Sequence, residues 1–164
     1  GTVSGIRTYN YSIKSFEPYN ITVYVNTDNT NWKKVNFHIW SSMTGFTEGT
    51  DWPGVNITQT KTIDNLNWYY KEFTITQKDG VINFVFCEPN DAGTKEKSQS
   101  LDITGVNSTT FIKVGPNKES GKYVVKNVTK DIDTGEAVAE GFSNKEQQGF
   151  IKDNKKLLKE NNNE

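Results

Sequence analysis

The sequence predicts an all-β fold, an antiparallel β-sandwich of the immunoglobulin-like kind, and two observations carry this prediction. Short stretches with apolar residues at every second position recur along the chain, and Gly, Asp and Asn separate them without any intervening helical periodicity. Apolar residues make up only 33% of the chain, while Trp, Tyr and Phe together supply 12%. That composition is typical of many short strands around a thin, aromatic-rich core.

The first two expected strands show the alternation most clearly. In Ile21–Val25, Ile and Val alternate with Thr and Tyr, as a half-buried strand requires. Val35–Trp40 has Val, Phe and Ile on its inward face, which puts His38 and Trp40 together on the opposite face. If the Val-Phe-Ile set belongs to the core, this His and this Trp cannot both belong to it.

Later stretches predict further strands. Val81–Cys87 is apolar at nearly every position, which is typical of a central strand covered on both faces, and it places Cys87 as a half-buried strand residue. Trp68–Ile75 carries three successive aromatic residues before an inward Phe and Ile, so at least one of those three is expected in the core. The remaining expected strands are Leu101–Ile103, Phe111–Val114 and Tyr123–Val128.

The 164 residues suit one domain with short flanking segments. Residues 1–19 form a lead-in, residues 20–129 the sandwich, and residues 130–164 a charged linker or a short C-terminal helix. Ser143 with Glu146 three positions later favours the helix, whereas a linker to a neighbouring module fits the Asn-rich end equally well. Asp131–Gly135 resembles the start of a calcium loop, but Phe142 replaces its final Glu, so an ordinary Asx turn is the better interpretation.

Composition argues against several classes of function. A net charge of −1 offers no attraction for nucleic acid, and no apolar run is long enough for membrane insertion. The single cysteine excludes a disulfide framework within the chain and a multi-cysteine zinc site. No metal or cofactor is expected. His38 is the only histidine and no nucleophile-elbow motif accompanies it, so the chain is not expected to be an enzyme.

A glycosidase pair remains open at this stage, because such an enzyme needs only two carboxylates facing one cleft. The candidate carboxylates are Asp51, Glu48, Glu72 and Glu88.

Aromatic residues on a polar surface suggest a different kind of site. His38 and Trp40 share the outer face of one strand, and Trp52-Pro53-Gly54 closes a following loop rich in Gly, Thr and Ser. A pyranose has an apolar face and a rim of hydroxyls, so ring faces with nearby polar groups fit it. Each residue also has a structural alternative: Trp40 buried between strands, Trp52 plugging the end of the sandwich, and His38 as an ordinary surface histidine.

Five segments follow one another in a distinctive order: the strand Val35–Trp40, the Trp-Pro-Gly-Val of residues 52–55, the Asn-Trp-Tyr-Tyr of residues 67–70, the apolar strand Val81–Phe86, and Gln99–Ile103. Taken together, they resemble the family 26 carbohydrate-binding modules, close relatives of family 25. The resemblance covers about residues 20 to 114. Two departures stand out. Cys87 replaces the Asn that usually follows the apolar strand, and a long charged loop runs from Glu88 to Ser98.

The resemblance implies a non-catalytic module that binds starch or maltooligosaccharides at a shallow aromatic surface. By the motif match, His38 and Trp40 take the places of the two strand aromatics, Trp52 that of the loop platform, and Gln99 that of a Gln contacting hydroxyls. The charged loop adds Glu88 and Lys97 as candidate ligand contacts. Such a module is expected to be monomeric, extracellular or on a bacterial cell surface, and joined to neighbouring modules of the same polypeptide.

The competing interpretation is an immunoglobulin-like spacer or protein-interaction domain of a multidomain extracellular protein. In that case Trp40 and Trp52 would be packing residues. Exposure of the two indoles distinguishes the two interpretations.

Overall fold

A computed structural model describes residues 15–135 and confirms the all-β sandwich. Ten strands form two five-stranded sheets, and a 3-10 turn, η2 (Thr129–Asp131), follows the last strand. The helix-or-linker alternatives for the chain around Ser143 lie outside the described residues. The lead-in is described only from residue 15 onward, where the chain enters the first strand.

The first sheet, called sheet A, has the order β10-β9-β1-β5-β4. Its strands are β1 (Tyr19–Asn26), β4 (Thr60–Ile63), β5 (Leu66–Ile75), β9 (Thr110–Glu119) and β10 (Lys122–Asn127). Among these described strands β1 and β9 pair in parallel, and the other pairings are antiparallel. The antiparallel prediction therefore holds for every pair of named strands in this sheet but one.

The second sheet, called sheet B, has the order β3-β2-β6-β7, with β8 also paired to β6. Its strands are β2 (Val35–Trp40), β3 (Val55–Ile57), β6 (Ile82–Pro89), β7 (Glu96–Gln99) and β8 (Ile103–Val106). Strand β6 lies between β2 on one side and β7 and β8 on the other. The central position expected for residues 81–87 is confirmed, since side chains on both faces of β6 are buried.

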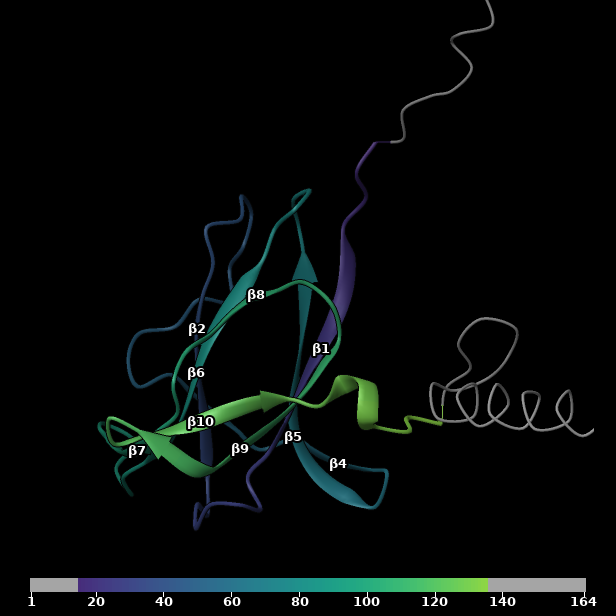
Figure 1. Ribbon diagram of the computed structural model, residues 1–164. Coiled ribbons are helices and arrows are strands. Elements are labelled where there is room, and N and C mark those ends of the chain that lie inside the picture. The colour runs from purple at the N-terminus through teal and green to yellow at the C-terminus, as the bar shows by residue number, and fades with distance from the viewer. Residues whose placement is uncertain (1–14, 136–164) are drawn as a thin grey trace, which may run out of the picture.

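The core lies between the two sheets, as Figure 1 shows with β2, β6 and β8 on one side and β1 and β5 on the other. Alternation places the inward side chains as expected: Val23 and Val25 from β1 and Phe37 and Ile39 from β2 are fully buried. Burial of apolar area drives this arrangement at ~25 cal/mol per Å². The opposite face of β2 consequently carries Asn36, His38 and Trp40.

The outer face of sheet A has an apolar cluster of its own. Trp68 has no exposed surface and packs against Phe111, Val128 and Ile132. The 3-10 turn η2 follows Val128 and brings Ile132 back over this face. Trp68 is therefore the core aromatic expected in β5, although it belongs to the second cluster, and the packed structure reaches past residue 129 to Ile132.

Three strands were not expected from the sequence: β3, β4 and β7. They are short or polar, and all three lie at sheet edges, where one side of the strand has no pairing partner and apolar alternation is not required. The expected loop from Glu88 to Ser98 is consequently wrong, because β6 runs to Pro89 and β7 begins at Glu96. The strand expected at Leu101–Ile103 begins only at Ile103.

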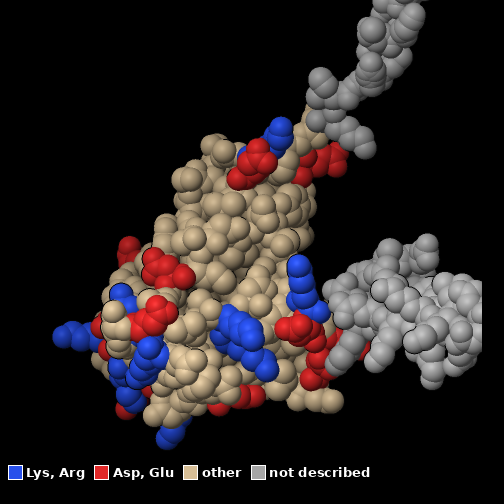
Figure 2. Space-filling view, in the orientation of Figure 1, with Lys and Arg blue, Asp and Glu red and all other residues tan. Residues whose placement is uncertain are grey.

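Where charged side chains gather on the visible surface, both signs are mixed. Figure 2 shows Lys and carboxylate groups mixed at the end that carries β7 and the β9–β10 hairpin, while the middle of this face is largely uncharged. Neither sign forms a continuous patch on this face. No helix among the described residues has the length and apolar character needed to cross a bilayer.

Candidate functional site

Three rings meet on the outer face of sheet B. Strand β2 presents His38 and Trp40 with ring centroids 5.3 Å apart and planes tilted by 34°. The loop after β2 returns the chain so that Trp52 stands 5.2 Å from His38, with its plane at 78° to the imidazole. Trp52 is 41% exposed, whereas His38 and Trp40 are half-buried. These three residues, here called the ring triad, form an angled surface. The tilted pair of His38 and Trp40 is one wall, and Trp52 is the other.

Two side chains of sheet B hold the backbone of the loop that carries Trp52. The side-chain amide of Asn36 donates to the Pro53 carbonyl at 3.2 Å, and the Cys87 thiol donates to the same oxygen at 3.2 Å. Asn36 and Cys87 are paired residues of β2 and β6, and both are buried although they lie on the outer face. Burial raises the pKa of the Cys87 thiol to about 12, so the group stays protonated and able to donate at neutral pH.

Gly54 allows the loop to approach β2 closely. Its φ is +95°, and a Cβ atom there would overlap the Phe37 carbonyl and lie 2.6 Å from the His38 amide nitrogen. Only glycine fits a backbone that is both left-handed and pressed against a strand.

Gly54→Ala is expected to destabilise the protein by about 2 kcal/mol and to displace Trp52, because either the loop or β2 must move. Chemical denaturation checks the first effect and near-UV circular dichroism the second. Gly93→Ala is the matched control, because Gly93 also has a positive φ of +74° but a Cβ added there would meet no atom within 4 Å. Equal losses in the two variants would mean that φ alone, and not the close approach, sets the cost.

His38 is held by a hydroxyl from the loop. Its Nδ1 lies 3.0 Å from the Thr50 Oγ1, which also accepts a hydrogen bond from the Ile39 amide at 3.0 Å. The Thr50 amide donates to the Ile39 carbonyl at 2.9 Å, so Thr50 continues the strand pairing beside β2. The imidazole is thereby restrained through Nδ1, and Nε2 takes no part in this contact.

Trp52 is held by a carboxylate from a distant strand. Its indole Nε1 donates to the Glu96 Oε1 at 2.8 Å, across a separation of 44 residues. This hydrogen bond, together with one from the backbone and the charge of Lys95, lowers the pKa of Glu96 from its ordinary value of 4.5. Glu96 is therefore an anion at neutral pH, and the bond to the indole is charge-assisted.

The Trp52 indole signal is expected to titrate in acid. Because the pKa of Glu96 is lowered in the folded state, its contribution to stability is fully present above pH 4.5 and is lost as the pH falls through the lower, folded value. The Hε1 resonance of Trp52, followed by NMR, should move with a midpoint below pH 4.5. The Trp68 Hε1, bonded to the Ile63 carbonyl, is the internal control and should not move. A Trp52 resonance that stays constant until the protein unfolds would contradict the assigned contact.

The other residues predicted for the site divide into two groups. Gln99 of β7 pairs with Cys87, which pairs with Asn36, so these three residues form one row across the outer face that carries the ring triad. Glu88 and Lys97 lie elsewhere, with their charged atoms 3.9 Å apart. The Glu88 carboxylate is buried and accepts a hydrogen bond from the Lys33 amide at 2.6 Å. Glu88 and Lys97 both line a depression that Tyr123 also borders.

Alternation along β6 separates Glu88 from this row, and the register shift between β6 and β7 after Glu88 separates Lys97 from it. Glu88 follows Cys87, so it points to the opposite face of the sheet, and its partner in β7 is Ser98 rather than Gln99. A charged loop near the site predicts Glu88 and Lys97 as ligand contacts, but the structure pairs them with each other and does not bring them to the rings.

Two residues of the site were missed by the sequence analysis, Thr50 and Glu96. Glu96 lies in β7, whose sequence Glu-Lys-Ser-Gln has no apolar alternation to reveal a strand. Thr50 is one of several threonines in a polar loop, and nothing local distinguishes it.

Of the four carboxylates considered for a glycosidase pair, two form ion pairs with lysines and two are exposed. Glu48 pairs with Lys71 at 3.2 Å, and Glu88 pairs with Lys97. Glu72 is exposed on β5 of the other sheet, and Asp51 is exposed in the loop before Trp52.

Acidic groups do not gather into a cation site in the described part of the chain. Within residues 15–135, no cluster of three or more His, Cys, Asp or Glu side chains could hold a metal ion. Asp133 forms the expected Asx turn, accepting a hydrogen bond from the Gly135 amide at 3.0 Å.

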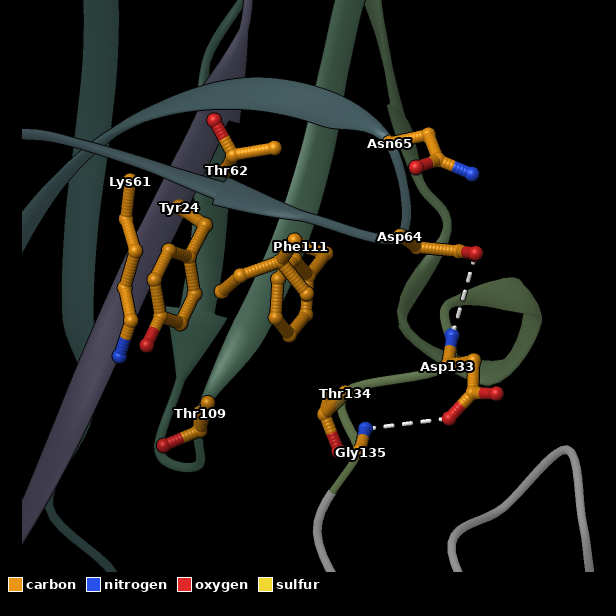
Figure 3. Close-up of a pocket in the computed structure, with 11 residues that line it drawn as sticks. Tyr24, Lys61, Thr62, Asp64, Asn65, Thr109, Phe111, Asp133, Thr134 and Gly135 are labelled. Atoms are coloured by element: carbon orange, nitrogen blue, oxygen red, sulfur yellow. Dashed lines mark hydrogen bonds between the residues drawn. The ribbon is translucent and has the colours of Figure 1, made fainter.

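A separate depression of about 470 Å³ lies over the outer face of sheet A. Figure 3 shows its residues: the Tyr24 ring stands between Lys61 and Phe111, and the Asp133 amide donates to the Asp64 carboxylate. Tyr24 and Phe111 are stacked at 4.3 Å, and Phe111 is only 2% exposed. Phe111 is therefore a packing residue, while Tyr24 is half-buried like His38 and Trp40, and neither stacked ring is as exposed as Trp52.

Comparison of the chain with models of protein families, with curated proteins and with solved structures finds no match.

Proposed function

We propose that this chain is a non-catalytic module that binds α-1,4-linked glucan, as starch or maltooligosaccharide, at the ring triad. The single observation that carries the proposal is the meeting of His38, Trp40 and Trp52 on one sheet face, with Trp52 41% exposed. A sugar ring can stack its apolar face on an indole, and such a contact contributes about 1 kcal/mol beyond area burial.

The angles between the rings favour a curved ligand. His38 and Trp40 are tilted by only 34°, so they act as one gently bent surface, while Trp52 stands at 78° to His38. A flat β-1,4-glucan ribbon would meet one wall and miss the other. The helical curve of an α-1,4-glucan brings successive sugar units against both, which favours starch over cellulose.

Polar groups near the rings suit the hydroxyl rim of a sugar. Gln99 lies in the same row as Asn36 on this face and is half-buried, so its amide can both donate and accept. Each such hydrogen bond returns about 1 kcal/mol after desolvation. A few stacked rings and hydrogen bonds give dissociation constants of roughly 10 µM to 1 mM. Weak binding of this kind becomes useful through avidity, when several modules on one polypeptide face a multivalent granule.

The proposed setting is a larger extracellular or cell-surface protein that uses this module to reach starch. In that setting the module acts as a monomer, and its partners are the glucan and the neighbouring modules of its own polypeptide.

Affinity electrophoresis in gels containing amylopectin, together with pull-down on insoluble starch, cellulose and xylan, tests the proposal. Retardation and retention by α-glucans alone are expected. Indifference to every polysaccharide would contradict the proposal and favour a spacer or protein-interaction domain. Release of new reducing ends from soluble starch would show instead that the chain is catalytic.

A further inference from the structure

We propose that Glu96 is a positioning residue of this site, whose carboxylate holds the Trp52 indole in the plane that a glucan meets. The inference rests on the proposed function for its consequence in binding, but the contact itself can be tested in the free protein. It assigns a role to a residue that does not belong to the ring triad and need not touch the ligand.

The contacts that hold the backbone next to Trp52 would by themselves leave its side chain free to rotate. Asn36 and Cys87 hold the Pro53 carbonyl, and the fit of Gly54 against Phe37 holds the chain after it. None of these contacts involves the indole. With these contacts alone, an exposed Trp on a loop would sample several rotamers, and ordering it on binding would weaken the complex.

Two contacts do reach the indole. The His38 ring lies edge-to-face with it at 5.2 Å, and Glu96 accepts its N–H at 2.8 Å. A ring contact allows sliding and tilting, whereas a hydrogen bond to Nε1 fixes one edge of the indole. Glu96 is thus the contact that selects the perpendicular orientation of Trp52.

The position of Glu96 explains how a loop residue can be preorganised. Glu96 lies on β7, which is tied to β6 through the pairs Cys87–Gln99 and Pro89–Glu96. The carboxylate therefore approaches Trp52 from a sheet strand, while the loop itself is anchored on β2. Since the indole N–H is already used by Glu96, the ligand meets the faces of Trp52 and not its donor.

The test compares Glu96→Ala with Glu96→Gln, because the Gln side chain retains an oxygen that can accept the indole N–H while lacking the charge. Binding to maltoheptaose and amylopectin is measured by calorimetry and affinity electrophoresis, and the Trp52 Hε1 resonance is followed by NMR after assignment with Trp52→Phe. Glu72→Ala is the control, since Glu72 is an exposed carboxylate on sheet A.

We expect Glu96→Ala to weaken binding about two- to tenfold, the cost of ordering one side chain, while Glu96→Gln stays within about twofold of the wild type. The Trp52 Hε1 resonance should move far upfield in the Ala variant, less in the Gln variant, and not at all in the control. Melting temperatures should stay within about 2 °C of the wild type, because an exposed side chain contributes little to the core.

Three results would overturn the inference. Wild-type affinity in Glu96→Ala would show that the orientation of Trp52 does not need the carboxylate. Equal losses in Ala and Gln with an unmoved indole resonance would show that the charge contacts the glucan directly. An unmoved Trp52 resonance in Glu96→Ala would refute the positioning role, whether or not the wild type binds glucan. Absence of glucan binding in the wild type would count against the proposed function alone.

Discussion

Replacing Trp40 with alanine is expected to abolish detectable binding to α-glucans while leaving the fold intact. Trp40 is half-buried and forms a gently bent surface with the His38 ring. Its removal deletes one of the two ring faces on which a sugar can stack. The lost stacking and area burial amount to about 2 to 3 kcal/mol, or roughly a hundredfold in affinity. A module that binds at micromolar to millimolar concentrations would then fall below detection.

The measurement is affinity electrophoresis on amylopectin with a thermal melt of the same samples. Trp40→Phe is the control, because it keeps an aromatic face and should retain part of the retardation. A stability loss of about 1 kcal/mol or less is expected for Trp40→Ala, since the side chain lies outside the main core. A large fall in melting temperature would mean that Trp40 is a structural residue, and the spacer interpretation would gain.

Replacing Trp68 with alanine is expected to have the opposite consequence, a loss of about 3 to 5 kcal/mol of stability. Trp68 has no exposed surface and stands 5.0 Å from Phe111 in an edge-to-face contact. Its indole donates to the Ile63 carbonyl at 3.0 Å, so truncation also leaves that acceptor without this donor. Trp68 anchors the end of the described chain, through Val128 and Ile132, to the outer face of sheet A.

Denaturant unfolding measures this effect, and Trp68→Phe should recover about half of the loss because it refills much of the cavity. Under conditions where Trp68→Ala remains folded, its glucan affinity should equal that of the wild type, since the ring triad lies on the other sheet. A Trp68→Ala protein as stable as the wild type would contradict the packing described for the second cluster. The two Trp→Ala variants together separate binding from folding.

The residues that sequence reasoning placed correctly are those governed by alternation along a single strand. Phe37 and Ile39 face the core and His38 and Trp40 the outer face because successive side chains of a strand point in opposite directions. The same rule identified β1 and the central position of β6. Cys87, expected to be half-buried, is fully buried because the Pro53 loop covers it, and alternation within β6 gives no information about that cover.

The charged segment after β6 shows where sequence reasoning stopped. Interpreted as a loop, this segment predicts Glu88 and Lys97 as ligand contacts and gives no reason to choose Glu96. In the structure, residues 96–99 form a strand that pairs with β6 across a bulge, and Glu96 accepts a hydrogen bond from the Trp52 indole. Glu88 instead accepts a hydrogen bond from the Lys33 amide. An exposed polar edge strand has no hydrophobic pattern, so its direction and register depend on the pairing partner.

The sequence by itself determined the all-β class, the inward and outward faces of the main strands, and the presence of His38 and Trp40 on one surface, because each of these depends on local alternation. Only the tertiary structure decided that Trp52 crosses His38 at 78°, that Glu96 holds its indole, and that Trp68 anchors the end of the described chain. Those contacts join residues far apart in the chain, and their geometry depends on loop closure and strand register, which no single segment encodes.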